Sequence, residues 1–172
     1  MEKISKKNIC LVGLMGSGKT HVGKILSKEL GLRFIDTDIL IEKKMNMTIN
    51  QIFKEYGEKY FRDIEEKITL DVLKKKSNCV ISLGGGAFIN KNIQELVLKK
   101  NISFWLKWKN STIIKRLKNA NKRPLLKEMN HKQIVNLNTE RSKLYSKANY
   151  ILECDNLNKN EIIKKIIQNY EN

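Results

Sequence analysis

Residues 13–20 read Gly-Leu-Met-Gly-Ser-Gly-Lys-Thr and fit the pattern GxxxxGK[ST] at every defined position. An apolar strand is predicted directly before this segment, at residues 8–12, and an amphipathic helix follows it, at residues 19–30. Glycines let the backbone pass close to phosphate oxygens with its N–H groups turned inward, and the helix N-terminus adds positive potential. The segment therefore predicts a nucleoside triphosphate site at the end of the first strand.

Two side chains of this loop and two acidic residues farther on have an expected chemical role. Lys19 is expected to reach the β- and γ-phosphates, and the Thr20 hydroxyl is expected to ligate Mg²⁺. Asp36 and Asp38 follow a second predicted strand, whose carboxyl end we expect beside the loop. There Asp36 can hold the Mg²⁺ shell, and Asp38 can orient an acceptor hydroxyl or take its proton. The alternative for this pair is a helix N-cap, with Asp38 capping the helix that follows.

Predicted strands and helices alternate along the whole chain. Short apolar segments predict five strands, at residues 8–12, 33–35, 79–83, 102–106 and 150–152. Helical spacing of apolar residues predicts helices at residues 19–30, 39–45, 48–56, 58–75, near 93–97, near 113–117, at 132–147 and around 162–167. This order predicts an α/β fold of three layers, α/β/α, with a five-stranded parallel sheet. The length of 172 residues suits one domain, and ligands of such sheets bind beyond the carboxyl ends of the strands.

The chain carries 34 Lys and Arg against 18 Asp and Glu, a formal net charge of +16. Such a charge would support electrostatic binding to nucleic acid. Only five of the basic residues are arginine, however, while lysine, asparagine and isoleucine are abundant, as an AT-rich genome would produce. We therefore favour lysines spread over solvated helix faces and expect no specific nucleic-acid partner. The few arginines become informative, because their planar fork grips anions in two-point contacts.

Cysteine usage and hydropathy indicate where such a protein would work. Cys10, Cys79 and Cys154 are widely spaced and form no CxxC pair, which predicts reduced thiols in a cytoplasmic protein and no cysteine metal site. The longest stretch without a charged residue, 77–90, is too short and too rich in glycine to span a bilayer. The N-terminal residues lack the apolar core of a signal peptide. We therefore expect no membrane association.

Three glycines and two arginines are further candidates for ligand binding. Gly84, Gly85 and Gly86 end the third predicted strand, and close backbone approach to a ligand is the natural reason for three flexible residues there. Arg62 lies on a predicted helix beside acidic residues, so a surface ion pair is the alternative to anion binding. Arg123 lies in a polar segment between two helices, where a mobile lid can bring it to the transferring phosphoryl group.

Together these segments resemble the shikimate kinases, a family in the nucleoside-monophosphate-kinase-like group of P-loop proteins. The resemblance covers nearly the whole chain and rests on segments in the family's order and spacing: residues 13–20, 36–38, 57–66, 83–86, 123–126 and 141–145. It implies a cytoplasmic monomer that transfers the γ-phosphate of ATP to the 3-hydroxyl of shikimate, with Mg²⁺ as cofactor. The product would be shikimate 3-phosphate, on the route to chorismate and the aromatic amino acids. The resemblance also implies a substrate-binding insertion at about 37–64 and a lid at about 119–130 in a single kinase domain, residues 1–172.

The resemblance further implies roles for single residues. The catalytic residues would be Lys19, Asp38 and Arg123. The residues that bind ATP would be Gly16, Ser17, Gly18, Lys19, Thr20, His21, Arg116 and Arg123, with Arg116 over the adenine. The residues that bind shikimate would be Asp38, Arg62, Gly84, Gly85, Gly86 and Arg141, with the two arginines clamping its carboxylate. Thr20 and Asp36 would hold Mg²⁺.

The chain departs from the family pattern at three places. Thr20 replaces the more usual serine, and Lys143 stands where many members have proline. After the fifth predicted strand no basic-aromatic platform for adenine is found, so adenine would be held loosely there or by backbone groups. The alternative functions are another small-metabolite kinase, such as a gluconate kinase, a nucleotide-binding module without transfer activity, or a basic nucleic-acid-associated ATPase. Arg62 and Arg141 with the triple glycine suit a compact cyclic carboxylate and favour shikimate.

Overall fold

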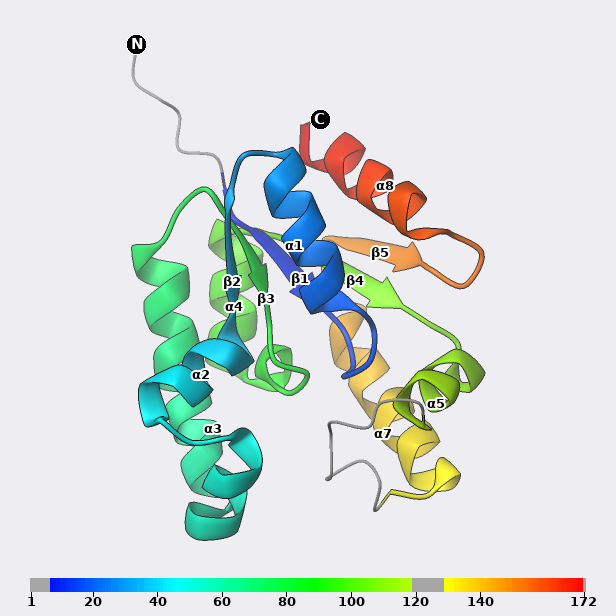
Figure 1. Ribbon diagram of the computed structural model, residues 1–172. Coiled ribbons are helices and arrows are strands. Elements are labelled where there is room, and N and C mark those ends of the chain that lie inside the picture. Colours follow the sequence, from blue (N-terminus) through cyan, green and yellow to red (C-terminus); the bar gives the residue numbers. More distant parts are fainter. Residues whose placement is uncertain (1–6, 119–128, 172) are drawn as a thin grey trace.

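The computed structural model describes residues 7–118 and 129–171 (Figure 1). Five parallel strands form one sheet in the order β2-β3-β1-β4-β5. Their bounds are β1 Ile9–Val12, β2 Arg33–Asp36, β3 Cys79–Ser82, β4 Ile102–Lys107 and β5 Tyr150–Glu153. The helices are α1 Lys19–Glu29, α2 Thr37–Met45, α3 Ile49–Lys75, α4 Lys91–Lys100, α5 Asn110–Lys118, α7 His131–Tyr145 and α8 Lys159–Glu171, with a 3₁₀ turn η1 at Ala87–Ile89. The predicted five-stranded α/β fold is confirmed.

The central strand β1 is buried on both faces, and its alternating side chains separate two parts of the core. Ile9 and Leu11 pack with residues of α1 and α8 on one face of the sheet. Cys10 and Val12 pack with residues of α3, α4 and α7 on the other. Because successive side chains of a strand point to opposite faces, one short apolar segment serves both helical layers. The three layers are visible in Figure 1, where α1 and α8 lie on the same side of the sheet.

The helices α2 and α3 extend beyond the carboxyl ends of the strands (Figure 1) and have a small apolar cluster of their own. Its buried members are Ile41, Ile52, Phe61 and Ile68. Within α3, Gly57 has φ 81° and ψ 172°, which interrupts the helix where the sequence predicted a break between residues 56 and 58. Glycine adopts this left-handed φ without the clash that a side chain would meet. Before this kink, Ile52 of α3 packs in the same apolar cluster as Ile41 of α2.

The helices α5 and α7 lie beyond the same carboxyl ends of the strands, across from α2 and α3 (Figure 1). They flank the segment predicted as a lid. Residues 119–128 of that segment, and with them Arg123, lie outside the described residues. The two helices are tied by a hydrogen bond of 2.6 Å from Asn138 Nδ2 to Asn110 Oδ1.

The three cysteines are unpaired and buried, and burial raises the pKa of the Cys10 thiol. Over residues 7–118 and 129–171, no helix combines the length and the apolar character needed to cross a membrane.

Candidate active site

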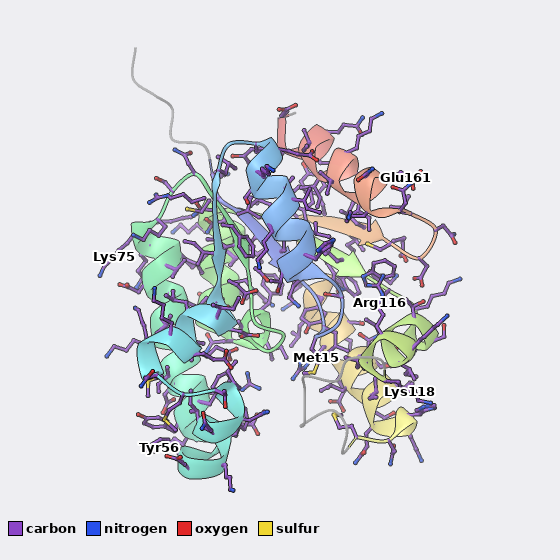
Figure 2. The ribbon with its side chains drawn as sticks, viewed as in Figure 1. Met15, Tyr56, Lys75, Arg116, Lys118 and Glu161 are labelled. Carbon is purple, nitrogen blue, oxygen red and sulfur yellow. The ribbon has the colours of Figure 1, made fainter. Side chains whose placement is uncertain are left out.

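A cavity of about 500 Å³ lies where the segments that follow β1, β2 and β3 meet. Its walls come from the phosphate loop, the start of α2, the helix α3, the glycine turn after β3 and the helix α7. Predicted site residues that line it are Thr20, Asp36, Asp38, Arg62, Gly85, Gly86 and Arg141. Met15, which also lines the cavity, lies on the loop between the α2–α3 and α5–α7 parts of the molecule (Figure 2). Residues far apart in the sequence therefore meet at the predicted edge of the sheet.

The phosphate loop curls around the ammonium group of Lys19. Nζ of this largely buried side chain donates to the carbonyls of Gly13 at 2.7 Å and Leu14 at 3.0 Å. Gly16 and Gly18 have φ of 79° and 91°, left-handed values that a side chain would strain. Ser17 is buried in the same loop, whereas His21 is exposed on the first turn of α1. The loop thus presents a cation and a tight backbone curve at the N-terminus of α1, as phosphate binding requires.

Thr20 and Asp36 are joined directly by a hydrogen bond of 2.6 Å from Oγ1 to Oδ2. The other carboxylate oxygen of Asp36 accepts the N–H groups of Asp38 at 3.1 Å and Ile39 at 3.3 Å, so Asp36 is the N-cap of α2. The interpretation of Asp38 as the cap is therefore wrong, because α2 begins two residues earlier than predicted and its first N–H groups point back to Asp36. A hydroxyl and a carboxylate side by side are ligands that suit Mg²⁺.

Asp38, on the first turn of α2, lies close to the glycine turn that follows β3. A methyl group on Gly84 would lie 3.3 Å from Cγ of Asp38 and 2.9 Å from Oε1 of Glu65, so a side chain at position 84 would displace both carboxylates. The N–H of Gly84 donates to the Thr37 hydroxyl at 2.9 Å, which fixes the turn against α2. The absence of a side chain at Gly84 is what lets the turn approach these acidic groups.

Arg62 forms ion pairs on α3 and also lines the cavity. Its Nη1 lies 2.7 Å from Oε2 of Glu65, and its Nη2 lies 3.3 Å from Oε1 of Glu58. Glu65 is 3% exposed, and this burial raises the pKa of its carboxyl group, while the charge of Arg62 opposes part of the rise. The ion pair considered as an alternative is thus present, and it orients the guanidinium within the cavity. Glu65 was not among the predicted site residues, although its position three residues after Arg62 on a helix is the signal for such a pair.

Arg141 and Tyr145, one turn apart on α7, both donate to the carbonyl of Gly85. The distance from Nη1 of Arg141 is 3.2 Å, and the hydroxyl of Tyr145 makes a shorter bond. Arg141 lines the cavity even though Lys143 stands where proline was expected. Tyr145 is a second residue at the cavity wall for which the sequence predicted no role of its own. Its partner lies 60 positions away in the chain, and no local pattern points to that contact.

Trp108 and Arg116 form a stacked pair on the outer side of the phosphate loop. Cζ of Arg116 lies 3.6 Å from the centroid of the indole ring. The indole N–H donates to the carbonyl of Ser17 at 2.9 Å, and Nη1 of Arg116 donates to that of Gly16 at 3.4 Å. Figure 2 shows Arg116 directed from α5 toward the phosphate-loop side of the molecule. A basic-aromatic pair is therefore present beside the loop, with Trp108 between β4 and α5 and Arg116 in the last turn of α5.

The comparisons with known proteins agree with this geometry. The sequence model of the shikimate kinase family matches residues 15–171. The shikimate kinase of Thermodesulfovibrio yellowstonii is 40% identical over 166 residues, which cover 96% of this chain and 95% of the relative. A shikimate kinase from Acinetobacter baumannii, solved in complex with shikimate, is 33% identical with a TM-score of 0.88, covering 94% of this chain and 91% of the other. One from Bacteroides thetaiotaomicron is 28% identical, also with a TM-score of 0.88, covering 96% and 99%. The chain belongs to the shikimate kinase family.

Proposed function

We propose that this chain transfers the γ-phosphate of ATP to the 3-hydroxyl of shikimate, giving shikimate 3-phosphate and ADP. The observation that carries the proposal is the cavity in which Asp38, Arg62 and Arg141 converge beside the phosphate loop. A carboxylate for hydroxyl groups and two guanidinium groups for a carboxylate complement a small anionic polyol. The family membership and the A. baumannii relative in complex with shikimate support the same acceptor.

The nucleotide side of the reaction would be handled by the phosphate loop. Lys19, now bonded to loop carbonyls, would donate to the β- and γ-phosphates, with the backbone N–H groups of residues 16–20 around them. Thr20 and Asp36 have the hydroxyl and carboxylate oxygens to hold Mg²⁺. When bound, this ion would neutralise part of the phosphate charge. Arg116 would lie over the adenine, and Arg123 would donate to the transferring phosphoryl group. His21, exposed beside the loop, stays a predicted ATP contact.

The acceptor side would be handled by Asp38 and the two arginines. Asp38 would orient the 3-hydroxyl and receive its proton while the oxygen forms its bond to the γ-phosphorus and the bond to the β-phosphate oxygen breaks. Arg62, held by Glu65, and Arg141 would grip the carboxylate of shikimate. The N–H groups of the turn at Gly84, Gly85 and Gly86 would approach the ring. Because the carboxylate of shikimate would be held away from the reacting 3-hydroxyl, the molecule would be bound at two points. This would orient the hydroxyl for the transfer.

Other features of the proposal follow from the family and are open to test. They are an insertion at about 37–64 that binds shikimate, a lid at about 119–130, a monomeric state and a cytoplasmic location. We propose no nucleic-acid partner for the charge of +16, because lysines spread over solvated helix faces account for it. Gluconate stays the second candidate acceptor, because it is also a small hydroxylated carboxylate.

The test is ADP release in a coupled assay with Mg²⁺, ATP and one acceptor at a time: shikimate, quinate, gluconate, nucleoside monophosphates or water alone. We expect turnover with shikimate well above every other acceptor. The variant Lys19→Ala, which lacks the cation of the phosphate loop, is the control for contaminating kinases and should release almost no ADP. Equal rates with all acceptors, or release with water only, would reject the proposal. Preference for gluconate would select the second candidate.

A further inference from the structure

The carbonyl oxygen of Gly85 is held twice by one helix. It accepts Nη1 of Arg141 at 3.2 Å and the hydroxyl of Tyr145, both from α7. The N–H of Gly84, at the start of the same turn, is fixed by the Thr37 hydroxyl at 2.9 Å. The turn is therefore anchored to α2 at one peptide group and to α7 at the next.

The two donors to this carbonyl differ in what else they face. Arg141 lines the cavity, so its guanidinium is shared with any anion that binds there. Tyr145 is 1% exposed, and its ring lies 5.8 Å from that of Trp105 in the core. A buried tyrosine hydroxyl requires a hydrogen-bond partner, and here the partner is the turn. Burial raises the pKa of Tyr145 to about 12, with the charge of Arg141 opposing the rise, so the hydroxyl keeps its proton near neutral pH.

The orientation of this carbonyl decides the direction of a neighbouring donor. The Gly85 carbonyl and the Gly86 N–H belong to one planar trans peptide group and therefore point in opposite directions. With the carbonyl held against α7, the Gly86 N–H points away from that helix. Arg62 lies close to this glycine, since a methyl group on Gly86 would lie 2.9 Å from its Cζ. Within residues 7–118 and 129–171, the N–H groups of Gly85 and Gly86 have no hydrogen-bond acceptor.

We propose that Tyr145 is a positioning residue, whose hydroxyl fixes the Gly85 carbonyl so that the Gly86 N–H stays directed into the cavity for the bound acid. The role matters most when the substrate is present, because a bound carboxylate would then compete with the Gly85 carbonyl for the Arg141 guanidinium. Tyr145 keeps the peptide in place without touching the substrate. The identity of that acid as shikimate rests on the proposed function, whereas the orientation of the peptide does not.

The first test compares Tyr145→Phe with Tyr170→Phe. The hydroxyl of Tyr170, on α8, also donates to a backbone carbonyl, that of Lys7 at 2.9 Å, so its removal is a matched control away from the cavity. We expect Tyr145→Phe to raise the KM for shikimate roughly three- to tenfold, the loss of about one hydrogen bond, and to leave the KM for ATP within about twofold. Tyr170→Phe should change neither. An unchanged KM for shikimate in Tyr145→Phe would overturn the proposal, as would a parallel rise of both constants with a lower thermal midpoint than the control.

A second measurement needs no substrate. In ¹H–¹⁵N spectra of the ligand-free protein, Tyr145→Phe should shift the amide resonances of Gly85 and Gly86, and Tyr170→Phe should not. Addition of shikimate should move the Gly86 resonance of the unaltered protein farther than that of Tyr145→Phe. If the unaltered protein fails to use shikimate, the proposed function is rejected, and the ligand-free spectra still judge the role of Tyr145. Identical Gly85 and Gly86 resonances in the unaltered protein and Tyr145→Phe would overturn that role.

Discussion

The guanidinium group of Arg116 lies over the indole of Trp108, with 3.6 Å between Cζ and the ring centroid. Both side chains also donate to carbonyls of the phosphate loop, Arg116 to Gly16 and Trp108 to Ser17. A cation held over an aromatic ring is attracted by the negative face of that ring. Trp108 therefore fixes the arginine that we propose to lie over the adenine, and it supports the loop that we propose to bind the phosphates.

Replacing Trp108 by alanine should weaken ATP binding and leave the acid site intact. We expect the KM for ATP to rise roughly thirtyfold, since a cation–π contact and a hydrogen bond each contribute about 1 kcal/mol. The KM for shikimate should stay within about twofold, because Trp108 is not among the residues that line the cavity. Steady-state kinetics with each substrate varied in turn measures both constants.

The variant Trp108→Phe separates the two contacts of this side chain. It keeps an aromatic face under Arg116 and loses only the N–H that reaches Ser17. Its KM for ATP should fall between those of the unaltered enzyme and Trp108→Ala. A rise in the KM for shikimate as large as that for ATP would instead mean that Trp108 supports the fold as a whole.

The carboxylate of Asp38 should be essential to transfer and dispensable for nucleotide binding. Asp38→Asn keeps the size of the side chain but removes the group that orients the hydroxyl and receives its proton, so kcat should fall by about a hundredfold or more. The dissociation constant for ADP, measured by calorimetry, should change by less than about twofold, since Thr20, Asp36 and the phosphate loop are unaltered. Asp63→Asn, an exposed carboxylate on α3, is the matched control and should keep full activity. Full activity of Asp38→Asn would remove Asp38 from the mechanism.

Periodicity and motif spacing were enough to predict the sheet, its parallel strands and the edge where the site lies. Apolar segments of strand length and apolar residues at helical spacing reflect burial in the sheet and against it. Both patterns are found within short stretches of the sequence. The break at Gly57 was also predictable, because glycine is the residue that adopts a positive φ most readily. The glycines of the loop at residues 13–20 have the positive φ values that a tight backbone curve needs, while the contact of Lys19 with phosphates stays a prediction.

Contacts between distant segments could not be predicted in the same way. The bond from Tyr145 to Gly85 spans 60 positions, and the one from Trp108 to Ser17 spans 91. Both depend on how helices and loops pack around the sheet edge, which no single stretch of sequence encodes. The choice of Asp36 over Asp38 as the helix cap is a smaller case. It depends on which residue the first free N–H groups of α2 meet, and a shift of the helix start by two residues reverses the answer.

A methyl group at Gly86 should damage substrate binding without damaging the fold. Gly86 has φ −97° and ψ −16°, values that alanine adopts readily, so the backbone tolerates the change. The new methyl group would collide with the guanidinium of Arg62, which must then leave its place in the cavity. We expect Gly86→Ala to raise the KM for shikimate at least about tenfold, the loss of one charged hydrogen bond. The thermal midpoint should change little, and a large fall in this midpoint with an unchanged KM would contradict the expected role of Arg62.

The buried carboxyl group of Glu65 should make stability depend on pH in a predictable direction. Burial raises its pKa above the ordinary value of 4.5, and Arg62 opposes only part of that rise. The folded protein therefore binds this proton more tightly than the unfolded chain does. The resulting stabilisation is complete below pH 4.5 and is lost as the pH rises through the raised pKa.

Glu65→Gln cannot titrate, so comparison with it isolates this contribution. Measured by denaturant unfolding from about pH 4 to about pH 7, the stability of the unaltered protein relative to Glu65→Gln should decrease as the pH rises. Glu66 is the matched control on the same helix: hydrogen bonds from Asn92 and Asn90 lower its pKa. Its contribution is present above pH 4.5 and is lost as the pH falls, so the difference from Glu66→Gln should increase with pH. If both differences changed in the same direction, or that for Glu65→Gln were independent of pH, the buried carboxyl group would not titrate as its surroundings require.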